Sequence, residues 1–528
     1  MDCGRDDKKD LNQDDKKDLN WQLLPGKSQS LWIGTTQEAS YPPLQRSISA
    51  DVAILGAGIA GLTAAVLLKQ AGVKVAVIEA GRVAGGVSGH TTAKITLAHT
   101  LIYDYLISNF GKERAHLYAD ANQAAIERIA SFIKEKGISC DFSRTFACTY
   151  TEDEKNLDKI EAEVNAAKKL GLSAAYADTV PLPFPIKGAV CFGNQAQFHP
   201  RKYLLSLAAL IPGDGSHIFE ATKAVGLDRT PHSYRIKTQQ GEVNARSVIV
   251  ATHFPFLNRG LFFARMYPRR SYLMAMHTRG NQVPDGMYIT PDEPHHRTIR
   301  SHIMESGEKF LLVGGEHHKT GQGEDTREYY RRIEQYARKR FEVESIDYHW
   351  STQDNVSIDR VPFIGPFTLL SRQLYVATGF GGWGMTNGTA AGMILSDLIL
   401  GRPNPWAALF DPCRLPHLAG AKTFVSQNLN VAEAFTCGHL LHSPLKKSFA
   451  DLAEGEGAII QVDAARVAAY KDDQGTVHAF SANCSHLGCV LSWNSAEKTW
   501  DCPCHGARFD YDGKVIHAPA IKDLPKKV

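Results

Sequence analysis

The chain has 528 residues, of which 43% are hydrophobic and 22% are charged, so it is long enough for several domains and has the composition of a globular protein. Its formal net charge of +3 gives no overall field that would attract nucleic acid or an anionic membrane surface. The most apolar stretch, residues 52–68, carries glycines at phosphate-loop spacing, so we expect no membrane span.

The N-terminus contains a charged direct repeat. Asp-Asp-Lys-Lys-Asp-Leu-Asn stands at residues 6–12 and again at residues 14–20. A charged segment without apolar periodicity cannot contribute to a core. We therefore expect residues 1–45 to form a charged tail and lead-in, without a secretory signal.

Residues 51–79 have the pattern of a nucleotide-binding βαβ unit. A β-branched run leads into a G-x-G-x-x-G turn, a helix with apolar spacing follows, and a second strand ends at Glu79. Gly56 permits the tight turn, Gly58 lets the backbone approach a pyrophosphate, and Gly61 lets helix and strand pack closely. The positive end of the helix then faces the phosphates, and Glu79 can accept hydrogen bonds from ribose hydroxyls. The pattern predicts a bound dinucleotide.

Later stretches indicate that this dinucleotide is FAD. They are the small-residue stretch at 84–93, the strand at 244–252, the sequence Asp-Arg-Val-Pro-Phe-Ile-Gly at 359–365 and the glycine-rich sequence at 374–386. Together they resemble the flavin-contacting segments of the superfamily of D-amino-acid oxidase, glycine oxidase and sarcosine oxidase. The resemblance covers roughly residues 30–410. It implies the cofactor and the fold, but it does not indicate the substrate.

The resemblance also implies which residues contact FAD. The helix expected over residues 387–400 would direct its N-terminus at the pyrimidine end of the flavin, and its positive end would favour the anionic reduced form. The expected cofactor-binding residues are Gly56, Gly58, Gly61, Glu79, Arg82, Ser88, Gly89, Ala251, Thr252, Gly379, Gly381, Gly382, Gly384, Met385 and Thr386.

Flavoproteins that oxidise amines need little acid–base machinery, because they mainly align the substrate carbon with the flavin. The candidate catalytic residues are His90, Thr91, Thr92 and Trp383, and His253 is also expected to face the flavin. Some relatives attach FAD covalently through a histidine in a His-Ala-Ala-Gly run. This chain reads His-Thr-Thr-Ala there, so covalent attachment and a hydrogen-bonding loop histidine both stay open.

Other polar side chains could shape the substrate pocket. The spacing of His199, His317 and His318 does not indicate metal ligands, although these side chains could line a pocket. Five arginines are candidate clamps for a substrate carboxylate: Arg144, Arg201, Arg269, Arg270 and Arg300.

The segments between the flavin motifs are too long to be loops. Helical spacing is seen over residues 101–136 and 160–170, and strand-like stretches lie within residues 274–318. We predict an α/β plus all-β protein. A Rossmann-like FAD-binding domain interleaved with an α+β substrate domain is expected over residues 46–412, then a linker over 413–429 and a small antiparallel β domain over 430–528.

Two short boxes near the C-terminus are rich in cysteine and histidine. They read Cys-Ser-His-Leu-Gly-Cys at residues 484–489 and Cys-Pro-Cys-His-Gly at residues 502–506. A Cys₂His₂ set from two loops can hold a [2Fe–2S] cluster, with both thiolates on one iron and both imidazoles on the other. The same donors also suit tetrahedral zinc. A zinc finger keeps its cysteines together ahead of its histidines and needs no extra cysteine pair, so the spacing favours the cluster.

The boxes resemble those of the Rieske family, in the subtype of the respiratory and photosynthetic cytochrome complexes. In those proteins a second cysteine in each box forms a disulfide that ties the two cluster loops together. The neutral imidazoles place the potential at about −150 to +300 mV. The resemblance implies that Cys484, His486, Cys502 and His505 bind the cluster and that Cys489 and Cys504 form the disulfide.

The second box departs from the high-potential members of that family. They read Cys-His-Gly-Ser-x-Tyr, and the serine and tyrosine hydroxyls donate hydrogen bonds to the cluster sulfurs. This chain has Ala507 and Phe509 at these two positions. Such hydrogen bonds stabilise the reduced cluster, so we expect a potential in the lower half of the span of about −150 to +300 mV.

The remaining six cysteines are scattered. We interpret them as free thiols in a reducing compartment and expect a cytoplasmic protein. They are Cys3, Cys140, Cys148, Cys191, Cys413 and Cys437.

The combination of flavin and cluster predicts a dehydrogenase. FAD takes two electrons from a substrate, whereas the cluster carries one electron at a time. We expect oxidation of an amine, an amino acid or a related small molecule, with electrons passed singly to an acceptor. Rieske-type oxygenases carry a mononuclear iron domain after the cluster, and only residues 506–528 follow here, so we expect no self-contained oxygenase.

Two alternatives remain open. The first is an electron-transfer flavoprotein that exchanges electrons with a carrier protein or a nicotinamide. Nicotinamide use would require a second glycine-rich βαβ unit, and the sequence shows none. The second alternative is a redox sensor whose cluster state controls the binding of a partner.

Overall fold

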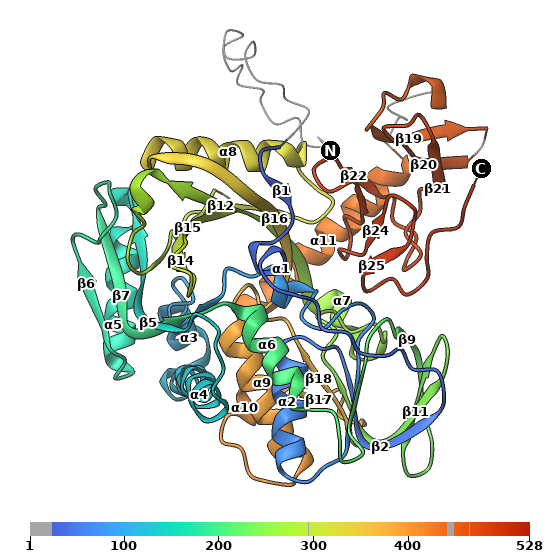
Figure 1. The fold of residues 1–528 in the computed structure, drawn as a ribbon, viewed down its shortest axis with the longest axis horizontal. Helices are drawn as coiled ribbons and strands as arrows, with labels where there is room; N and C mark the ends of the chain where they lie inside the picture. The colour runs from blue at the N-terminus through green and yellow to red at the C-terminus, as the bar shows by residue number, and fades with distance from the viewer. Residues whose placement is uncertain (1–23, 294, 416, 441–447, 464, 528) are drawn as a thin grey trace.

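The computed structural model describes residues 24–293, 295–415, 417–440, 448–463 and 465–527, so the N-terminal repeat and Cys3 lie outside the described residues. Two large sheets and a separate C-terminal domain organise this part of the chain (Figure 1). Among the described residues, no helix combines the length and the apolar character needed to cross a membrane.

The first sheet belongs to the nucleotide-binding unit, and its central strands are parallel and buried. The predicted β-branched run forms β2 (Ile48–Leu55), which pairs in parallel with β3 (Val75–Ile78) and β11 (Glu242–Val250). On either side lie β8 (His217–Phe219), β18 (Leu374–Thr378) and β17 (Phe363–Pro366), while β10 (Tyr234–Thr238) and β9 (Ala224–Arg229) extend from β11.

Two helices pack closely on this sheet, α2 (Ile59–Gln70) and α9 (Gly384–Ile399). Small residues allow the close approach. A Cβ atom at Gly388 would lie 2.6 Å from Ile59 Cγ2, and one at Gly392 would lie 2.6 Å from Thr63 Cβ. Helix α9 begins three residues before the predicted position, so the glycine-rich loop is shorter than expected.

The second sheet is larger and mostly antiparallel. Its long central strands, β12 (Met266–Thr278), β15 (Lys309–Lys319) and β16 (Val343–Ser357), pair side by side, with β12 between the other two. The remaining strands are β1 (Lys27–Ser28), β4 (Lys94–Ile95), β5 (Ser143–Thr151), β6 (Ala174–Ala177), β7 (Gly188–Gln197), β13 (Met287–Ile289) and β14 (Arg297–Ile303).

Helices flank this sheet and connect it to the first one. The predicted helical segments form α3 (Tyr103–Phe110), α4 (Lys112–Lys136) and α5 (Leu157–Lys169). Glu163 of α5 accepts hydrogen bonds from the Tyr103 and Asp104 amides at 2.9 Å and so caps α3. The other helices of this part are α1 (Leu31–Gly34), α6 (Pro200–Ala209), α7 (Phe262–Arg265), α8 (Thr326–Arg340) and α10 (Ala407–Phe410).

The predicted boundaries differ from the structure in two places. The lead-in is part of the first domain, because β1 pairs with β16 and the side chains of Leu31 and Trp32 are fully buried. The predicted linker is largely helical. Helix α11 (Leu418–Leu440) runs across it and into the predicted C-terminal domain.

The C-terminal domain consists of two small antiparallel sheets, as predicted (Figure 1). One contains β19 (Gly457–Val462), β20 (Ala465–Lys471) and β21 (Val477–Ser481). The other contains β22 (Ser492–Asn494), β23 (Thr499–Asp501), β24 (Arg508–Asp510) and β25 (Val515–His517).

The interpretation of the scattered cysteines as free thiols is wrong for one pair. Cys148 and Cys191 are joined by a disulfide. They lie directly opposite each other in the antiparallel pair β5–β7, with their Cα atoms 4.1 Å apart. The two cysteines are 43 residues apart, and the sequence alone does not show that their strands pair in this register.

Candidate functional site

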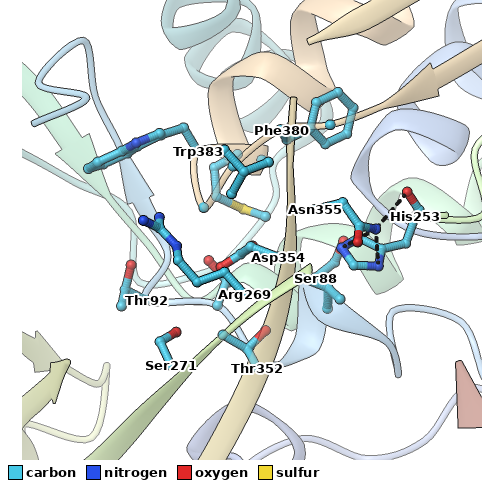
Figure 2. A pocket seen from close by; sticks show the side chains of 18 of the residues that line it. Ser88, Thr92, His253, Arg269, Ser271, Thr352, Asp354, Asn355, Phe380 and Trp383 are labelled. Atoms are coloured by element: carbon cyan, nitrogen blue, oxygen red, sulfur yellow. Dashed lines mark hydrogen bonds between the residues drawn. The ribbon is translucent and has the colours of Figure 1, made fainter. Parts of the chain in front are cut away.

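One large cavity, of about 670 Å³, lies between the two sheets. The nucleotide-binding turn, the loop after β3 and the glycine-rich loop before α9 form part of its wall, and strands β12 and β16 form another part. Figure 2 shows side chains from these segments around the cavity, including Thr92, Arg269, Asp354, Asn355 and Trp383.

The nucleotide-binding turn leaves room only for glycine at two predicted positions. A Cβ atom at Gly56 would lie 2.4 Å from the Ala251 carbonyl oxygen, and one at Gly61 would lie 2.0 Å from the Gly56 carbonyl oxygen. Glu79 accepts hydrogen bonds from the Ala57 amide at 2.9 Å and the Gly81 amide at 2.8 Å. Its carboxylate therefore faces the cavity from a fixed position, which fits the ribose of a dinucleotide.

Most of the predicted FAD contacts line the cavity, but several do not. Arg82 instead pairs with Glu220 at 3.0 Å, and its side chain is half exposed. Gly61, Gly89 and Thr386 support the walls from behind. The predicted residues that line the cavity are Gly56, Gly58, Glu79, Ser88, Ala251, Thr252, Gly379, Gly381, Gly382, Gly384 and Met385.

The four candidate catalytic residues separate into two groups. Thr91, Thr92 and Trp383 line the cavity. His90 is not among the lining residues, and its Nδ1 lies 2.8 Å from the Gly86 carbonyl oxygen. The His90 carbonyl oxygen accepts a hydrogen bond from Trp350 Nε1. His90 is therefore a loop histidine that is held by contacts with Gly86 and Trp350.

Asp354 is a cavity residue that no motif in the sequence indicated. It lies in β16, outside every flavin motif, so only the register of the large sheet directs it to the cavity. Burial raises its pKa to about 6, and the neighbouring Arg269 opposes this shift. Figure 2 shows the two side chains next to each other, so a carboxyl group and a guanidinium group face the same space.

The five candidate arginines differ in position and in their partners. Arg269 lines the cavity, whereas Arg144 pairs with Glu127 on the surface. Arg201 donates to Thr36, and Arg300 donates to the carbonyl oxygens of Thr92 and Ala93 and so holds the loop that carries the candidate threonines. Arg270 pairs with Glu497 of the C-terminal domain.

His99 and Lys94 also line the cavity without having been predicted. His99 stacks on Trp383 with ring centroids 4.7 Å apart, and burial lowers its pKa to about 3. Lys94 donates to the Tyr288 carbonyl oxygen at 2.6 Å, and burial lowers its pKa well below its usual value. Both side chains are held by their neighbours, so they shape the wall.

The two cysteine and histidine boxes form adjacent tight loops, one between β21 and β22 and the other between β23 and β24. In the first loop the Cys484 amide donates to the Cys489 carbonyl oxygen at 2.8 Å. In the second the Cys502 amide donates to the Ala507 carbonyl oxygen at 2.8 Å. The predicted disulfide, Cys489–Cys504, joins the two loops.

The four predicted ligands converge. A hydrogen bond between the Cys484 and Cys502 thiols raises the pKa of Cys484 and lowers that of Cys502. The His486 and His505 rings lie 5.2 Å apart, and burial lowers their pKa values to about 4 and about 3. Among the described residues, His505 Nδ1 and His486 Nε2 are buried without a hydrogen-bond partner. Neutral imidazoles and paired thiols fit a Cys₂His₂ cluster.

The cluster loops are docked against the first domain. The Phe263 ring lies 6.0 Å from the His486 ring and 5.5 Å from the His505 ring. Gln353 Nε2 donates to the Gly506 carbonyl oxygen at 2.9 Å, and a Cβ atom at Gly506 would lie only 2.4 Å from Pro268 Cβ. The second box therefore lies directly on β12 and β16.

Buried charges hold this interface together. Both carboxylate oxygens of Glu497 accept hydrogen bonds from Arg270 of the first domain at 2.6 Å. Glu497 also pairs with Arg508, which in turn donates to Asp501 at 2.9 Å. Removing one partner of a buried ion pair leaves an uncompensated buried charge, which is strongly destabilising. These pairs therefore fix how the two domains dock.

The C-terminal domain reaches the cavity itself. His517, in β25, lines the cavity together with His253 of the first domain, and their rings lie 6.0 Å apart. Asn355 donates to the His253 carbonyl oxygen at 3.2 Å. His253 was expected to face the flavin, whereas no motif in the sequence indicated His517, because the position of His517 depends on how the two domains dock.

Comparison with known families assigns both halves of the chain. Residues 51–398 match the model of the FAD dependent oxidoreductase family, DAO, and residues 445–527 match that of the Rieske [2Fe-2S] domain. The chain belongs to the DAO family of FAD-dependent oxidoreductases and carries a C-terminal Rieske domain. Its cofactors are accordingly FAD and a [2Fe–2S] cluster, as predicted.

Individual proteins resemble this chain over most of its length or over about 70% of it. A Bacillus subtilis protein named as a Rieske 2Fe-2S iron-sulfur protein, YhfW, is 39% identical over 94% of this chain and 97% of its own length. The gamma-glutamylputrescine oxidoreductase of Escherichia coli is 23% identical over 72% of this chain and 89% of its own. Glycine oxidase from Geobacillus kaustophilus superposes with a TM-score of 0.59 at 18% identity, over 70% of this chain and 99% of its own.

Proposed function

We propose that this oxidoreductase oxidises an amine, an amino acid or a related small molecule in the cavity and passes the electrons singly to its Rieske cluster and on to a one-electron acceptor. When bound, FAD takes two electrons from the substrate, and the cluster carries one at a time. We also propose that the residues that line the cavity and were predicted from the sequence hold FAD, and that Cys484, His486, Cys502 and His505 hold the cluster.

The observation that carries this proposal is the sharing of strand β16 by the two sites. Gln353 contacts the cluster loop at Gly506, and the next two residues, Asp354 and Asn355, line the cavity. The shared strand supplies a short covalent and hydrogen-bonded connection between the two cofactor sites, and His517 of the C-terminal domain lines the cavity. A domain that served only as a sensor would have no need for this contact.

The cavity chemistry supports a substrate with an amino group. Asp354 offers a carboxylate to an ammonium group. Arg269 donates to Glu293 through Nη1 at 3.0 Å and offers its remaining guanidinium hydrogens to a substrate carboxylate. The relative from Escherichia coli is named for the oxidation of gamma-glutamylputrescine, which is consistent with an amine substrate. Thr92 and Trp383 complete the wall around these charges, and they would align the substrate and exclude water.

Two further features remain proposals. We propose that the protein acts in the cytoplasm, as the sequence analysis expected, and that FAD is held without a bond to His90. The second rests on the contact of His90 Nδ1 with the Gly86 carbonyl oxygen and on the absence of His90 from the cavity wall. Acid precipitation that releases all of the flavin would support it, whereas flavin retained by the precipitate would contradict it.

A panel of amines and amino acids, mixed with the holoprotein in the absence of oxygen, tests the function. We expect one class of substrate to bleach the flavin absorbance first and then to produce the electron paramagnetic resonance signal of the reduced cluster. An electron-transfer flavoprotein would respond to a reduced carrier protein and to none of the panel. Flavin bleaching that is never followed by the cluster signal would favour a sensor.

A further inference from the structure

A second set of metal-binding side chains lies in the wall of the same cavity, away from the cluster boxes. Glu293, His296 and His317 all line the cavity, and one donor atom of each lies within 4.8 Å of those of the other two. Glu293 and His296 precede β14, and His317 lies in the neighbouring strand β15. The antiparallel pairing of β14 with β15 brings the three side chains together.

The two imidazoles are close together. Their ring centroids lie 3.2 Å apart. His296 is only 5% exposed, and among the described residues its buried Nδ1 has no hydrogen-bond partner. Buried nitrogens are normally paired, and a neutral imidazole nitrogen is the form that binds a metal.

The carboxylate of Glu293 is oriented toward this pair. His317 Nδ1 lies 3.1 Å and 3.3 Å from its two oxygens. Arg269 Nη1 donates to one of them at 3.0 Å. Carboxylates that bind metals are commonly held by such an outer hydrogen bond, although the charge of Arg269 opposes a cation. Two imidazoles and one oriented carboxylate make a complete three-residue donor set.

We propose that Glu293, His296 and His317 bind a divalent transition-metal ion of the zinc or ferrous class, in addition to the cluster. Mixed nitrogen and oxygen donors suit these ions better than magnesium or calcium, which prefer oxygen alone. Three protein ligands leave coordination positions open, and here these positions face the cavity. The site would therefore hold a polar group of the molecule that enters the cavity.

Zinc content measures the site independently of turnover, because the cluster contributes iron but no zinc. The holoprotein would be dialysed to equilibrium against zinc at several concentrations, and bound zinc would be counted by mass spectrometry. His295→Ala is the matched control, because His295 is the adjacent histidine, is largely exposed and pairs with Glu316 instead. Flavin and cluster absorbance would show that each variant is folded.

We expect the wild type and His295→Ala to bind one zinc ion per chain. His296→Ala, His317→Ala and Glu293→Gln should each bind zinc at least ~10-fold more weakly, because even changes to outer hydrogen bonds cost roughly that much affinity. If His296→Ala fails to fold, zinc binding by Glu293→Gln tests the proposal instead, because the Glu293 side chain is exposed. No zinc in the wild type, or unchanged binding in both Glu293→Gln and His317→Ala, would overturn the proposal.

Discussion

At the scale of single residues, the buried position of Asp354 in the cavity wall sets the pH at which its carboxyl group is charged. Burial raises the pKa of this carboxyl group to about 6, so the group is neutral in mildly acidic solution and charged above that. A substrate ammonium needs the charged form. Substrate binding should therefore change near pH 6, where enzyme kinetics can be measured.

We predict that kcat/KM for a cationic amine falls about tenfold per pH unit below a pKa of about 6 and levels off above it, until the amine itself loses its proton. Asp354→Asn should remove the acidic limb and lower the plateau. Asp214→Asn, a change at a highly exposed carboxylate outside the cavity, should leave the profile unchanged. An acidic limb that survives in Asp354→Asn would assign it to another group.

Ala507 and Phe509 stand where high-potential members of the Rieske family carry hydroxyl groups that donate to the cluster sulfurs. Both side chains are fully buried beside the second box, and neither carries a hydroxyl group. A charge-assisted hydrogen bond contributes about 1.5–3 kcal/mol, and about 1.4 kcal/mol corresponds to about 59 mV for one electron. Each missing donor therefore lowers the potential by up to about 60–130 mV.

We predict that Ala507→Ser and Phe509→Tyr each raise the cluster potential by up to about 130 mV, as measured by voltammetry on the protein film. Ala482→Ser, which adds a hydroxyl at another buried position in the same domain, should have little effect. A wild-type potential well above about +200 mV, near the top of the family range, would contradict the argument.

At the scale of elements, β16 is the strand on which the two cofactor sites meet. Gln353 is buried there. Its amide nitrogen donates to the Gly506 carbonyl oxygen at 2.9 Å, and its amide oxygen accepts from Thr320 at 3.0 Å. Loss of the side chain would leave two buried groups without partners, which costs about 1–3 kcal/mol for each group.

We predict that Gln353→Ala slows reduction of the cluster but leaves reduction of the flavin by substrate nearly unchanged, in rapid-mixing experiments without oxygen. Gln195→Ala is the matched control. Gln195 is equally buried and hydrogen-bonded, but it lies in β7, away from the domain interface. Equal cluster reduction rates in wild type and Gln353→Ala would show that the contact does not carry the coupling.

Local patterns predicted those parts of the structure that depend on neighbours in the sequence. The turn at Gly56 and Gly61 followed from spacing alone, because backbone crowding there admits only glycine. The register between strands that are far apart in the sequence could not be predicted from local patterns. Cys148 meets Cys191 only through strand pairing, and Asp354 reaches the cavity only through the alignment of β16 with β12.

At the scale of the whole molecule, the Rieske domain is part of the oxidoreductase rather than an appendage. Its His517 lines the cavity, its Glu497 pairs with the buried Arg270, and the Phe263 ring of the first domain lies 6.0 Å and 5.5 Å from the rings of the candidate ligands His486 and His505. His505 is buried, so a separate protein could not reach it directly. The docking therefore favours transfer of electrons within one chain.

The central claim is that electrons reach the cluster from the flavin of the same molecule. The most direct measurement is the rate of cluster reduction after the holoprotein is mixed with substrate without oxygen, followed by freeze-quench paramagnetic resonance at several protein concentrations. Transfer within one chain predicts a first-order rate that does not change with protein concentration. A rate that rises in proportion to protein concentration would contradict the account, because it would require two molecules to meet.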